Sequence, residues 1–337
     1  MSVDGAYIER VAMRPTLRTW IRHGLLFLAT LVTATIAGSM MPFGSLPILL
    51  PEPQTWSDAA NFLANFPSYY AFVIATPLHY LLTDSRFLVN GISFSGSLLF
   101  ILLSHEMGHY LMCRRYGVDA TLPYFIPTPP MIGPAGTFGA FIKIMSPMPS
   151  RTAVFDIGVA GPLAGFVALL PIAIIGVVKM QPVPLEIRDV TTAGLTFSDP
   201  LLMQLIGSVV GKDPGTSVGN PFYFAAWVGL LVTALNLIPS GQLDGGHAVY
   251  AVLGKRAHYF TGRIAFVVMF VLSIAGFLFF NSPSGFLFVI LLAVVTRIGH
   301  PDPIDQTPLD GKRKLVALLT LAVFVLCFVP FPIRVNF

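Results

Sequence analysis

The chain has 337 residues, of which 55% are hydrophobic and 11% are Asp, Glu, Lys or Arg, against roughly 25% charged residues in a typical soluble domain. Its mean hydropathy is +0.76. So few charges exclude an ordinary cytosolic enzyme, a disordered protein and a disulfide scaffold, and the cysteines Cys113 and Cys327 lie in or beside apolar runs. The net charge of +4 gives no sign of nucleic-acid binding. The composition predicts a multi-pass membrane protein with the lipid bilayer as a partner and no nucleic acid.

Seven stretches approach the roughly 20 apolar residues that a membrane-spanning helix needs. In chain order they are Gly24–Pro42, Ile92–Met112, Ala153–Met180, Pro221–Leu253, Phe260–Phe280, Ser284–Ile298 and Leu315–Pro330. An eighth stretch, Phe62–Leu82, contains Asn65, Pro67 and His79 and fits an interfacial or re-entrant segment. The stretch Pro221–Leu253 is long and interrupted by polar residues, which predicts a broken helix that forms a site.

Basic residues near the helix ends predict the orientation. Four of them precede the first stretch, namely Arg10, Arg14, Arg18 and Arg22. The later basic clusters fall on the same side only if Phe62–Leu82 makes no net crossing, so we predict seven crossings and a cytoplasmic N-terminus. Residues 1–23 then form a cytoplasmic segment. They lack the features of a cleavable signal and are expected to be retained.

The segment Ala120–Pro149 contains seven prolines and three glycines and is a poor helix. Within it, Gly136–Met145 is rich enough in aromatic and β-branched residues to pair as a strand. Two interpretations fit this segment. It is an interfacial loop packed on the bundle, or a short sheet edge that dips into the membrane.

The second apolar stretch contains Ser104-His-Glu-Met-Gly-His109. An ionisable residue in such a helix costs roughly 2.5–3.5 kcal/mol and is usually functional. His105 and His109, four residues apart, share one helix face and can bind one metal ion, while Glu106 can take a proton from a metal-bound water. This is the H-E-x-x-H arrangement of zinc hydrolases. The structural alternative is a pair of buried histidines bonded to backbone or to Tyr110.

A catalytic zinc ion takes three protein ligands and keeps one position open. The polar segment Asn236–His247 offers Asp244 and His247 for the third ligand. We favour Asp244, because a carboxylate in an apolar segment needs a nearby cation. Its alternative role is a helix cap after Pro239. His247 is the rival ligand, which we rank lower and interpret as a supporting or packing residue.

Asn236 has two interpretations of equal weight. It donates to the oxyanion of a tetrahedral intermediate, or it satisfies backbone groups freed by Pro239. Gly161-Pro-Leu-Ala-Gly165 has the small-xxx-small spacing that lets helices pack closely. Asp156 is interpreted as a charge in the helix dipole. Four further histidines are interpreted as interfacial, namely His23, His79, His258 and His300.

Taken together, these motifs resemble the site-2 protease family of intramembrane zinc metalloproteases. The resemblance spans roughly Leu25 to Gly254 and is closest to the branch of plastid EGY-type proteins and bacterial relatives. It rests on His105-Glu-x-x-His109, Gly136-Thr-Phe-Gly-Ala140, Gly161-Pro-Leu-Ala-Gly165, Asn236-x-x-Pro and Leu243-Asp-Gly245.

The resemblance implies His105, His109 and Asp244 as ligands of one Zn²⁺ per chain, with Glu106 as the catalytic base. Asn236, as the donor considered above, is our candidate for a further catalytic residue. It also implies a membrane-associated β-hairpin that binds substrate between the zinc-motif helix and the next helix. The hairpin is expected near Gly136–Ile144, with the substrate-binding residues Gly136, Thr137, Phe138, Gly139, Ala140 and Phe141. The expected fold is therefore an all-α multi-pass membrane protein with about seven transmembrane helices and this hairpin.

The implied activity is regulated intramembrane proteolysis, in which peptide bonds within or near transmembrane segments of membrane-anchored protein substrates are hydrolysed. Residues 24–254 would form the metalloprotease core and residues 255–337 the C-terminal transmembrane helices. The loop Gln181–Asn220 has no room for the PDZ domain of many bacterial members. We expect a bacterial cytoplasmic (inner) membrane protein, because the sequence lacks an Arg- and Ser-rich, acidic-poor leader.

Two other functions remain as alternatives. The first is a membrane metalloprotease that cuts soluble or prenylated termini, but those families use a downstream Glu as third ligand, and only Glu186 follows Glu106. The second is a transporter with an ion site at Asn236 and Asp244. It is less favoured, because no inverted repeat is visible and transport does not need Glu106.

Overall fold

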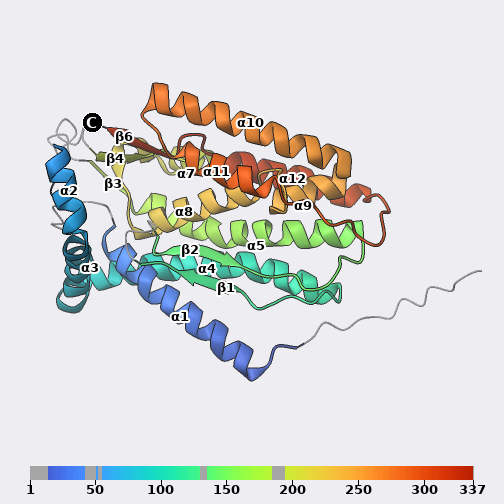
Figure 1. Cartoon of the computed structure of the whole chain (residues 1–337), viewed down its shortest axis with the longest axis horizontal. Coiled ribbons are helices and arrows are strands. Elements are labelled where there is room, and N and C mark those ends of the chain that lie inside the picture. The colour runs from blue at the N-terminus through green and yellow to red at the C-terminus, as the bar shows by residue number, and fades with distance from the viewer. Residues whose placement is uncertain (1–13, 42–50, 52–54, 130–134, 184–193, 337) are drawn as a thin grey trace, which may run out of the picture.

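The computed structural model describes residues 14–41, 51, 55–129, 135–183 and 194–336, which are mostly helical (Figure 1). The helices are α1 Leu17–Ser39, α2 Trp56–Ala64, α3 Phe66–Thr83, α4 Ser85–Arg115, α5 Arg151–Val178, α7 Leu201–Val210, the 3-10 helix η1 Pro214–Thr216, α8 Pro221–Asn236, α9 Asp244–Leu253, α10 Lys255–Phe280, α11 Gly285–Val295 and α12 Gly311–Cys327. The strands are β1 Tyr124–Pro127, β2 Thr137–Phe141, β3 Gln181–Pro182, β4 Gly194–Phe197, β5 Ser217–Val218 and β6 Ile333–Asn336. They pair antiparallel as β1–β2, β3–β5 and β4–β6.

The helices form one elongated bundle. The helices α4 and α5 pack side by side along its long axis, and α8 and α9 follow each other along α5 (Figure 1). The largest apolar core lies among α4, α5 and α8 and includes Phe94, Leu98, Leu169 and Leu230. Cys113 and Cys327 are both buried and free, in agreement with the expected lack of a disulfide framework.

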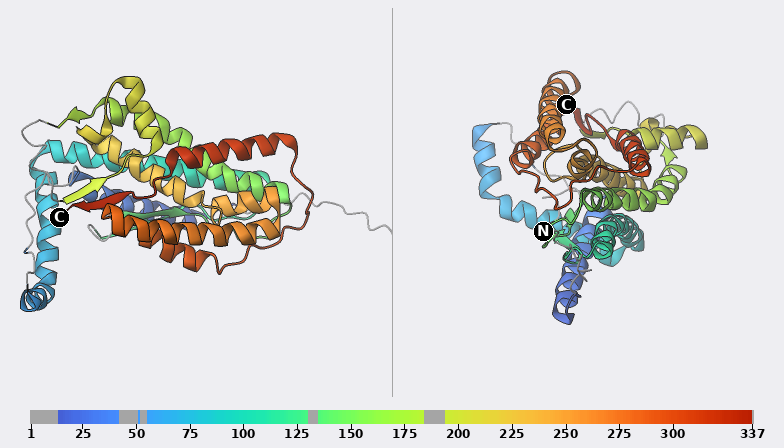
Figure 2. Two further views of the ribbon diagram at one scale, coloured as in Figure 1. Left: turned by 90° about the horizontal axis from the view of Figure 1, so that it is seen from above. Right: turned by 90° about the vertical axis from the view of Figure 1, so that its right-hand side faces the viewer.

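Within the described residues, four helices are long and apolar enough to cross a membrane, namely α1, α4, α5 and α10. The apolar helices α7, α8 and α11 are shorter, at 10–17 residues. The expected count of seven crossings is therefore not confirmed and stays a prediction. The ambiguous stretch Phe62–Leu82 falls in α2 and α3, which lie across one end of the bundle (Figure 2). Its interfacial or re-entrant position stays a prediction.

The long stretch Pro221–Leu253 is broken, as its polar residues predicted. Helix α8 ends at Asn236 and α9 begins at Asp244. Between them, Gly241 has φ +53°, and a Cβ there would overlap the carbonyl oxygen of Val295. The chain therefore turns where only glycine fits, and the turn directs the start of α9 back into the bundle.

The predicted strand also forms. The strand β2 pairs with β1, in the register Tyr124 with Phe141 and Phe125 with Ala140. The start of the strand is fixed by Gly136, which has φ +68° and whose carbonyl accepts a hydrogen bond of 2.7 Å from the hydroxyl of Thr33 in α1. The hairpin is thus held against α1.

Asp156 has a different role from the predicted one. Its carboxylate accepts two hydrogen bonds from the guanidinium of Arg313 at the start of α12, at 2.7 and 2.8 Å, and one from the hydroxyl of Tyr116 at the end of α4. The carboxylate of Asp156 is the main cause of a raised pKa at Arg313. Asp156 therefore ties three helices together at one end of the bundle.

The contact between α4 and α5 depends on glycine. A Cβ on Gly108 of α4 would overlap the carbonyl oxygen of Ala160 in α5. Gly96 of the same helix has nothing within 4 Å of its Cβ position. Gly108 therefore lies in a close helix contact and Gly96 does not, so Gly96 can serve as the control position for a substitution at Gly108.

We expect Gly108→Ala to lower the free energy of unfolding of the purified protein by about 1–3 kcal/mol, because the added methyl group forces the two helices apart. Gly96→Ala should leave stability unchanged or raise it by up to about 1 kcal/mol, since alanine is the better helix former. Thermal unfolding of both variants in one detergent tests this. Equal effects of the two substitutions would contradict the close contact.

Candidate metal centre and catalytic cavity

Three predicted ligands meet inside the bundle. His105 and His109 come from α4, and Asp244 comes from the first turn of α9. The Nε2 atoms of the two histidines lie 3.1 Å apart. The carboxylate oxygens of Asp244 lie 3.2 Å from Nε2 of His105 and 3.4 Å from Nε2 of His109. They are the only group of three or more His, Cys, Asp or Glu side chains among the described residues with metal-site spacing.

These separations fit zinc. Zinc binds nitrogen and oxygen ligands at about 2.0–2.2 Å in a tetrahedron, so two ligand atoms of one ion lie ~3.3 Å apart. The two Nε2 atoms, 3.1 Å apart, are close to that value, and each lies 3.2–3.4 Å from a different oxygen of Asp244. With one ligand atom from each residue, the three atoms lie within 4.8 Å of one another. The alternative that Asp244 serves as a helix cap is wrong, since the cap residue of α9 is Leu243 and the Asp244 carboxylate faces the histidines.

Helix α5 supports the histidines from behind. Nδ1 of His109 lies 2.7 Å from the backbone carbonyl of Ile157. A carbonyl only accepts, so Nδ1 carries the proton and Nε2 is left with a lone pair for a metal. A Cβ on Gly161 would overlap the ring of His109, and one on Gly165 would lie 3.1 Å from Cβ of His105. The small-residue spacing predicted as a helix contact therefore also makes room for both rings.

Glu106 is buried beside the ligands. The backbone N–H of Ile142, in the extended segment that follows β2, faces its carboxylate. Both residues line a cavity of about 710 Å³ that also contains the three predicted ligands. The carboxylate therefore faces a space large enough for a peptide segment.

Asn236 lies at the end of α8 and lines the same cavity. Its amide Nδ2 is 3.3 Å from Nε2 of His105. The amide thus lies at the metal site, next to one of the predicted ligands. This position favours the interpretation of Asn236 as a donor to a reacting group.

His247 is not part of the ligand group. Its Nδ1 lies 2.7 Å from Nε2 of His300, and its Cβ packs against Gly158 of α5. The ring of His300 in turn stacks on Tyr250, with centroids 4.0 Å apart. Burial lowers the pKa of His300 to about 4, so that ring is neutral at pH 7. The ranking of Asp244 above His247 agrees with this geometry.

Only part of the predicted substrate-binding set reaches the cavity. Ala140 and Phe141 line it, together with the following residues Ile142 to Ile144. The residues before Ala140 lie farther along the hairpin and do not line it, namely Gly136, Thr137, Phe138 and Gly139.

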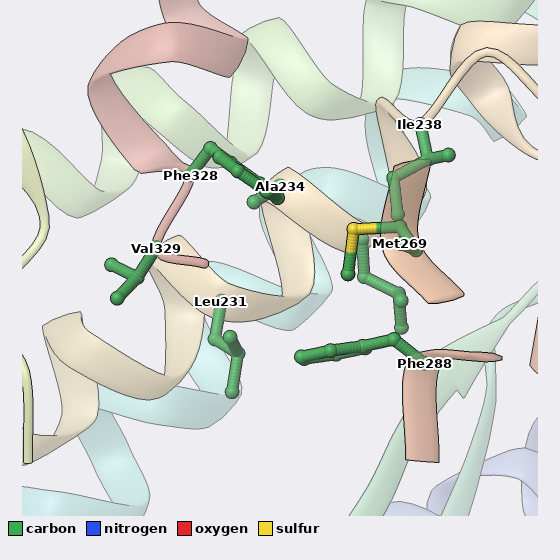
Figure 3. A pocket seen from close by; sticks show the side chains of 8 residues that line it. Leu231, Ala234, Ile238, Met269, Phe288, Phe328 and Val329 are labelled. Atoms are coloured by element: carbon green, nitrogen blue, oxygen red, sulfur yellow. The ribbon is translucent and has the colours of Figure 1, made fainter. Parts of the chain in front are cut away.

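Two backbone groups of the site could not be predicted from the sequence. The carbonyl of Ile157 and the N–H of Ile142 are backbone groups, which any residue type supplies. His300 was expected at an interface, but the loop after α11 brings it to the cavity wall. A second pocket, between α8, α10 and α11, is lined by apolar side chains alone and offers no group for catalysis (Figure 3).

Comparison with known proteins decides the family. The sequence pattern of Peptidase family M50 matches residues 93–278, which is more than half of the chain. The chain belongs to peptidase family M50, the site-2 protease family. The match covers both ligand-bearing segments of this M50 protein, in α4 and at the start of α9.

Curated relatives of the M50 chain include plant proteins. It is 29% identical to "Probable zinc metalloprotease EGY1, chloroplastic" of Arabidopsis thaliana over 94% of this chain and 54% of that protein. It is 30% identical to "Probable zinc metalloprotease EGY2, chloroplastic" of the same plant over 69% of this chain and 40% of that protein. The chain thus spans about half, or less, of the length of these relatives. No solved structure matches it.

Zinc content should separate the two candidate third ligands. We expect about one zinc per chain in detergent-purified wild type, loss of most of it in Asp244→Ala, and retention in His247→Ala, because only Asp244 is within metal-binding reach of both histidines. Elemental analysis measures this directly. Retention in Asp244→Ala together with loss in His247→Ala would overturn the assigned ligand set.

Proposed function

We propose that this chain is an intramembrane zinc metalloprotease that hydrolyses peptide bonds within or near the transmembrane segments of membrane-anchored proteins. The observation that carries the proposal is the cavity that joins His105, His109, Asp244 and Glu106 inside an apolar bundle. Membership of peptidase family M50 supports the same activity. The three ligands would leave one position of a tetrahedral zinc open for chemistry.

Zinc held by this triad would acidify a water molecule and polarise the scissile carbonyl. The carboxylate of Glu106 accepts the proton of the attacking water and later returns it to the leaving amine. The N–H of Ile142 faces that carboxylate. The amide of Asn236 donates to the oxygen of the scissile carbonyl as negative charge develops there.

The free edge of the hairpin is suited to hold an unwound substrate. The segment after β2 directs alternate peptide groups to opposite sides. The N–H of Lys143 donates a hydrogen bond of 2.9 Å to the hydroxyl of Thr121, and its carbonyl accepts one of 3.0 Å from the N–H of Thr121. These groups of Lys143 therefore face the side of β1. The N–H of Ile142 is directed the other way, to Glu106. By the same alternation, the peptide group of Ala140 is directed into the cavity.

A transmembrane helix hides its peptide bonds in its own hydrogen-bond ladder and must unwind before cleavage. The inward-directed groups of Ala140 and Ile142 would replace the lost hydrogen bonds by strand addition. We therefore place the substrate-binding edge in the segment that starts at Ala140, rather than over the whole predicted set Gly136–Phe141.

The arrangement supports the predicted topology. The first turns of α5, α10 and α12 and the last turn of α4 lie at one end of the bundle (Figure 1). Basic residues gather there, namely Arg114, Arg115, Arg151, Lys255, Arg256, Lys312, Arg313 and Lys314. We infer that this end is cytoplasmic, with the metal site about one to two helical turns inside it, because His109 precedes Arg114 by about 7.5 Å of helix. The bacterial inner membrane stays a prediction, since the named relatives are chloroplast proteins.

The alternatives are less well supported. A protease for soluble or prenylated termini would take a downstream Glu as third ligand, whereas Asp244 occupies that place and Glu186 lies outside the described residues. A transporter has no use for a carboxylate beside the ligands, where Glu106 lies.

Glu106→Gln tests the catalytic role. We expect it to keep one zinc per chain and to lower cleavage by about 10²–10⁴-fold, because an amide cannot accept the proton of the water. The substrate is a single-span membrane protein tagged at both ends, reconstituted with the purified protease and followed by the release of tagged fragments. Cleavage by the zinc-loaded variant at the wild-type rate would overturn the mechanism.

Ala140→Pro tests the substrate edge. Proline removes the inward-directed N–H, so we expect cleavage of the same reporter to fall by at least about fivefold, the loss of one hydrogen bond of about 1 kcal/mol. Zinc content should not change. Ala140→Val is the matched control, since it adds similar bulk and keeps the N–H. An equal loss of cleavage in both variants would show that bulk, rather than strand pairing, is the cause.

A further inference from the structure

A second polar cavity, of about 270 Å³, lies between the start of α10 and the end of α11. Its lining includes Lys255, Tyr259, Arg263, Thr296 and His300. No carboxylate is among its lining residues in the part of the chain that the structure describes. The cavity is separate from the metal site and touches it only through His300, which lines both.

The positive charge of this cavity comes from Arg263. Its guanidinium carbon lies 3.3 Å from the centre of the Tyr259 ring, and Nη1 donates to the Tyr259 carbonyl at 3.3 Å. The salt bridges found among the described residues do not include Arg263. Lys255, by contrast, is paired with Asp302 at 2.7 Å. A stacked, uncompensated guanidinium is a preformed site for a planar or tetrahedral oxyanion such as phosphate.

The surroundings of the cavity are apolar. Ile264, beside Arg263 on α10, is 61% exposed, and Ile298, which itself lines the cavity, is 47% exposed. Helix α10 is one of the four membrane-span candidates among the described residues, and its most apolar 18-residue window is only 17% buried. Most of its surface is therefore left uncovered by the rest of the described chain and is available to lipid. A ligand here meets positive charge at the end of the helix and hydrocarbon-compatible side chains next to it.

We propose that this cavity binds the phosphate headgroup of an anionic phospholipid, with an acyl chain lying along α10 beside Ile264. Three observations carry the proposal. Arg263 is an unpaired cation held in one orientation, no carboxylate opposes it in the cavity, and the neighbouring surface is apolar. Basic pockets between transmembrane helices at the cytoplasmic side are a known way of binding such headgroups. The site is independent of the proposed proteolysis.

The proposal is tested by native mass spectrometry of the full chain, purified in a neutral detergent and titrated with phosphatidylglycerol. We expect one lipid to be retained preferentially and Arg263→Gln to weaken that retention roughly fivefold, the contribution of one basic side chain. Arg256→Gln is the matched control, because Arg256 is an exposed basic residue of the same helix and does not line the cavity. It should bind like wild type.

Three results would overturn the proposal. Equal weakening by Arg263→Gln and Arg256→Gln would indicate diffuse surface attraction. Equal retention of neutral phosphatidylcholine would exclude selectivity for an anionic lipid. Displacement of phosphatidylglycerol by an equal concentration of inorganic phosphate would make this a site for a soluble anion. Arg263→Lys keeps the charge and loses the planar guanidinium, so it should bind phosphatidylglycerol with an affinity between those of wild type and Arg263→Gln. It replaces Arg263→Gln in the test if that variant does not fold. Wild-type affinity in Arg263→Lys would contradict the role of the stacked guanidinium.

Discussion

The site depends on one electrostatic constraint, which is the enclosure among apolar helices of the Asp244 carboxylate, whose side chain is only 15% exposed. A carboxylate away from water needs positive charge and hydrogen-bond donors. Within the described residues, the groups that meet it are the Nε2 atoms of His105 and His109, at 3.2 and 3.4 Å. Because the Nδ1 proton of His109 is used by the carbonyl of Ile157, Nε2 is available as a metal ligand. A divalent ion would neutralise the carboxylate and use the lone pairs of both rings. The site is therefore most stable when it holds a metal.

The histidines can reach this position because α4 and α5 pack closely against each other. Gly108, Gly161 and Gly165 remove the side chains that would separate α4 from α5, and two of them leave room for the imidazole rings. The break between α8 and α9 then brings the carboxylate to the same point. The orientation of His109 rests on a main-chain group, the carbonyl of Ile157. Side chains that are far apart in the sequence, on α4 and α9, thus meet at one site.

The C-terminal part of the chain contributes to the site as well as to the bundle. The loop after α11 adds His300, Pro301 and Asp302 to the wall of the catalytic cavity, although it lies outside the segment that matches the family. It is anchored by the ion pair of Lys255 with Asp302 and by the bonds of its backbone to residues 148–151. The predicted division into a core of residues 24–254 and a C-terminal helical region therefore cuts across a shared cavity. The same loop separates that cavity from the basic one at Arg263.

Local patterns in the sequence were enough to predict the metal ligands. The i, i+4 spacing of His105 and His109 places two ligands on one helix face whatever surrounds it, and an acidic residue in an apolar run, such as Asp244, needs a cation in any fold. Helix periodicity and the cost of buried charge are local, so they can be read from a single chain. The contact of His247 with His300, and the fact that the cavity-lining part of the hairpin begins at Ala140, became visible only in the tertiary structure. The same holds for the bonds of Arg313 to Asp156 and of His109 to the carbonyl of Ile157. These outcomes depend on which backbone atoms and distant residues become neighbours, and main-chain groups carry no sequence signal because every residue has them.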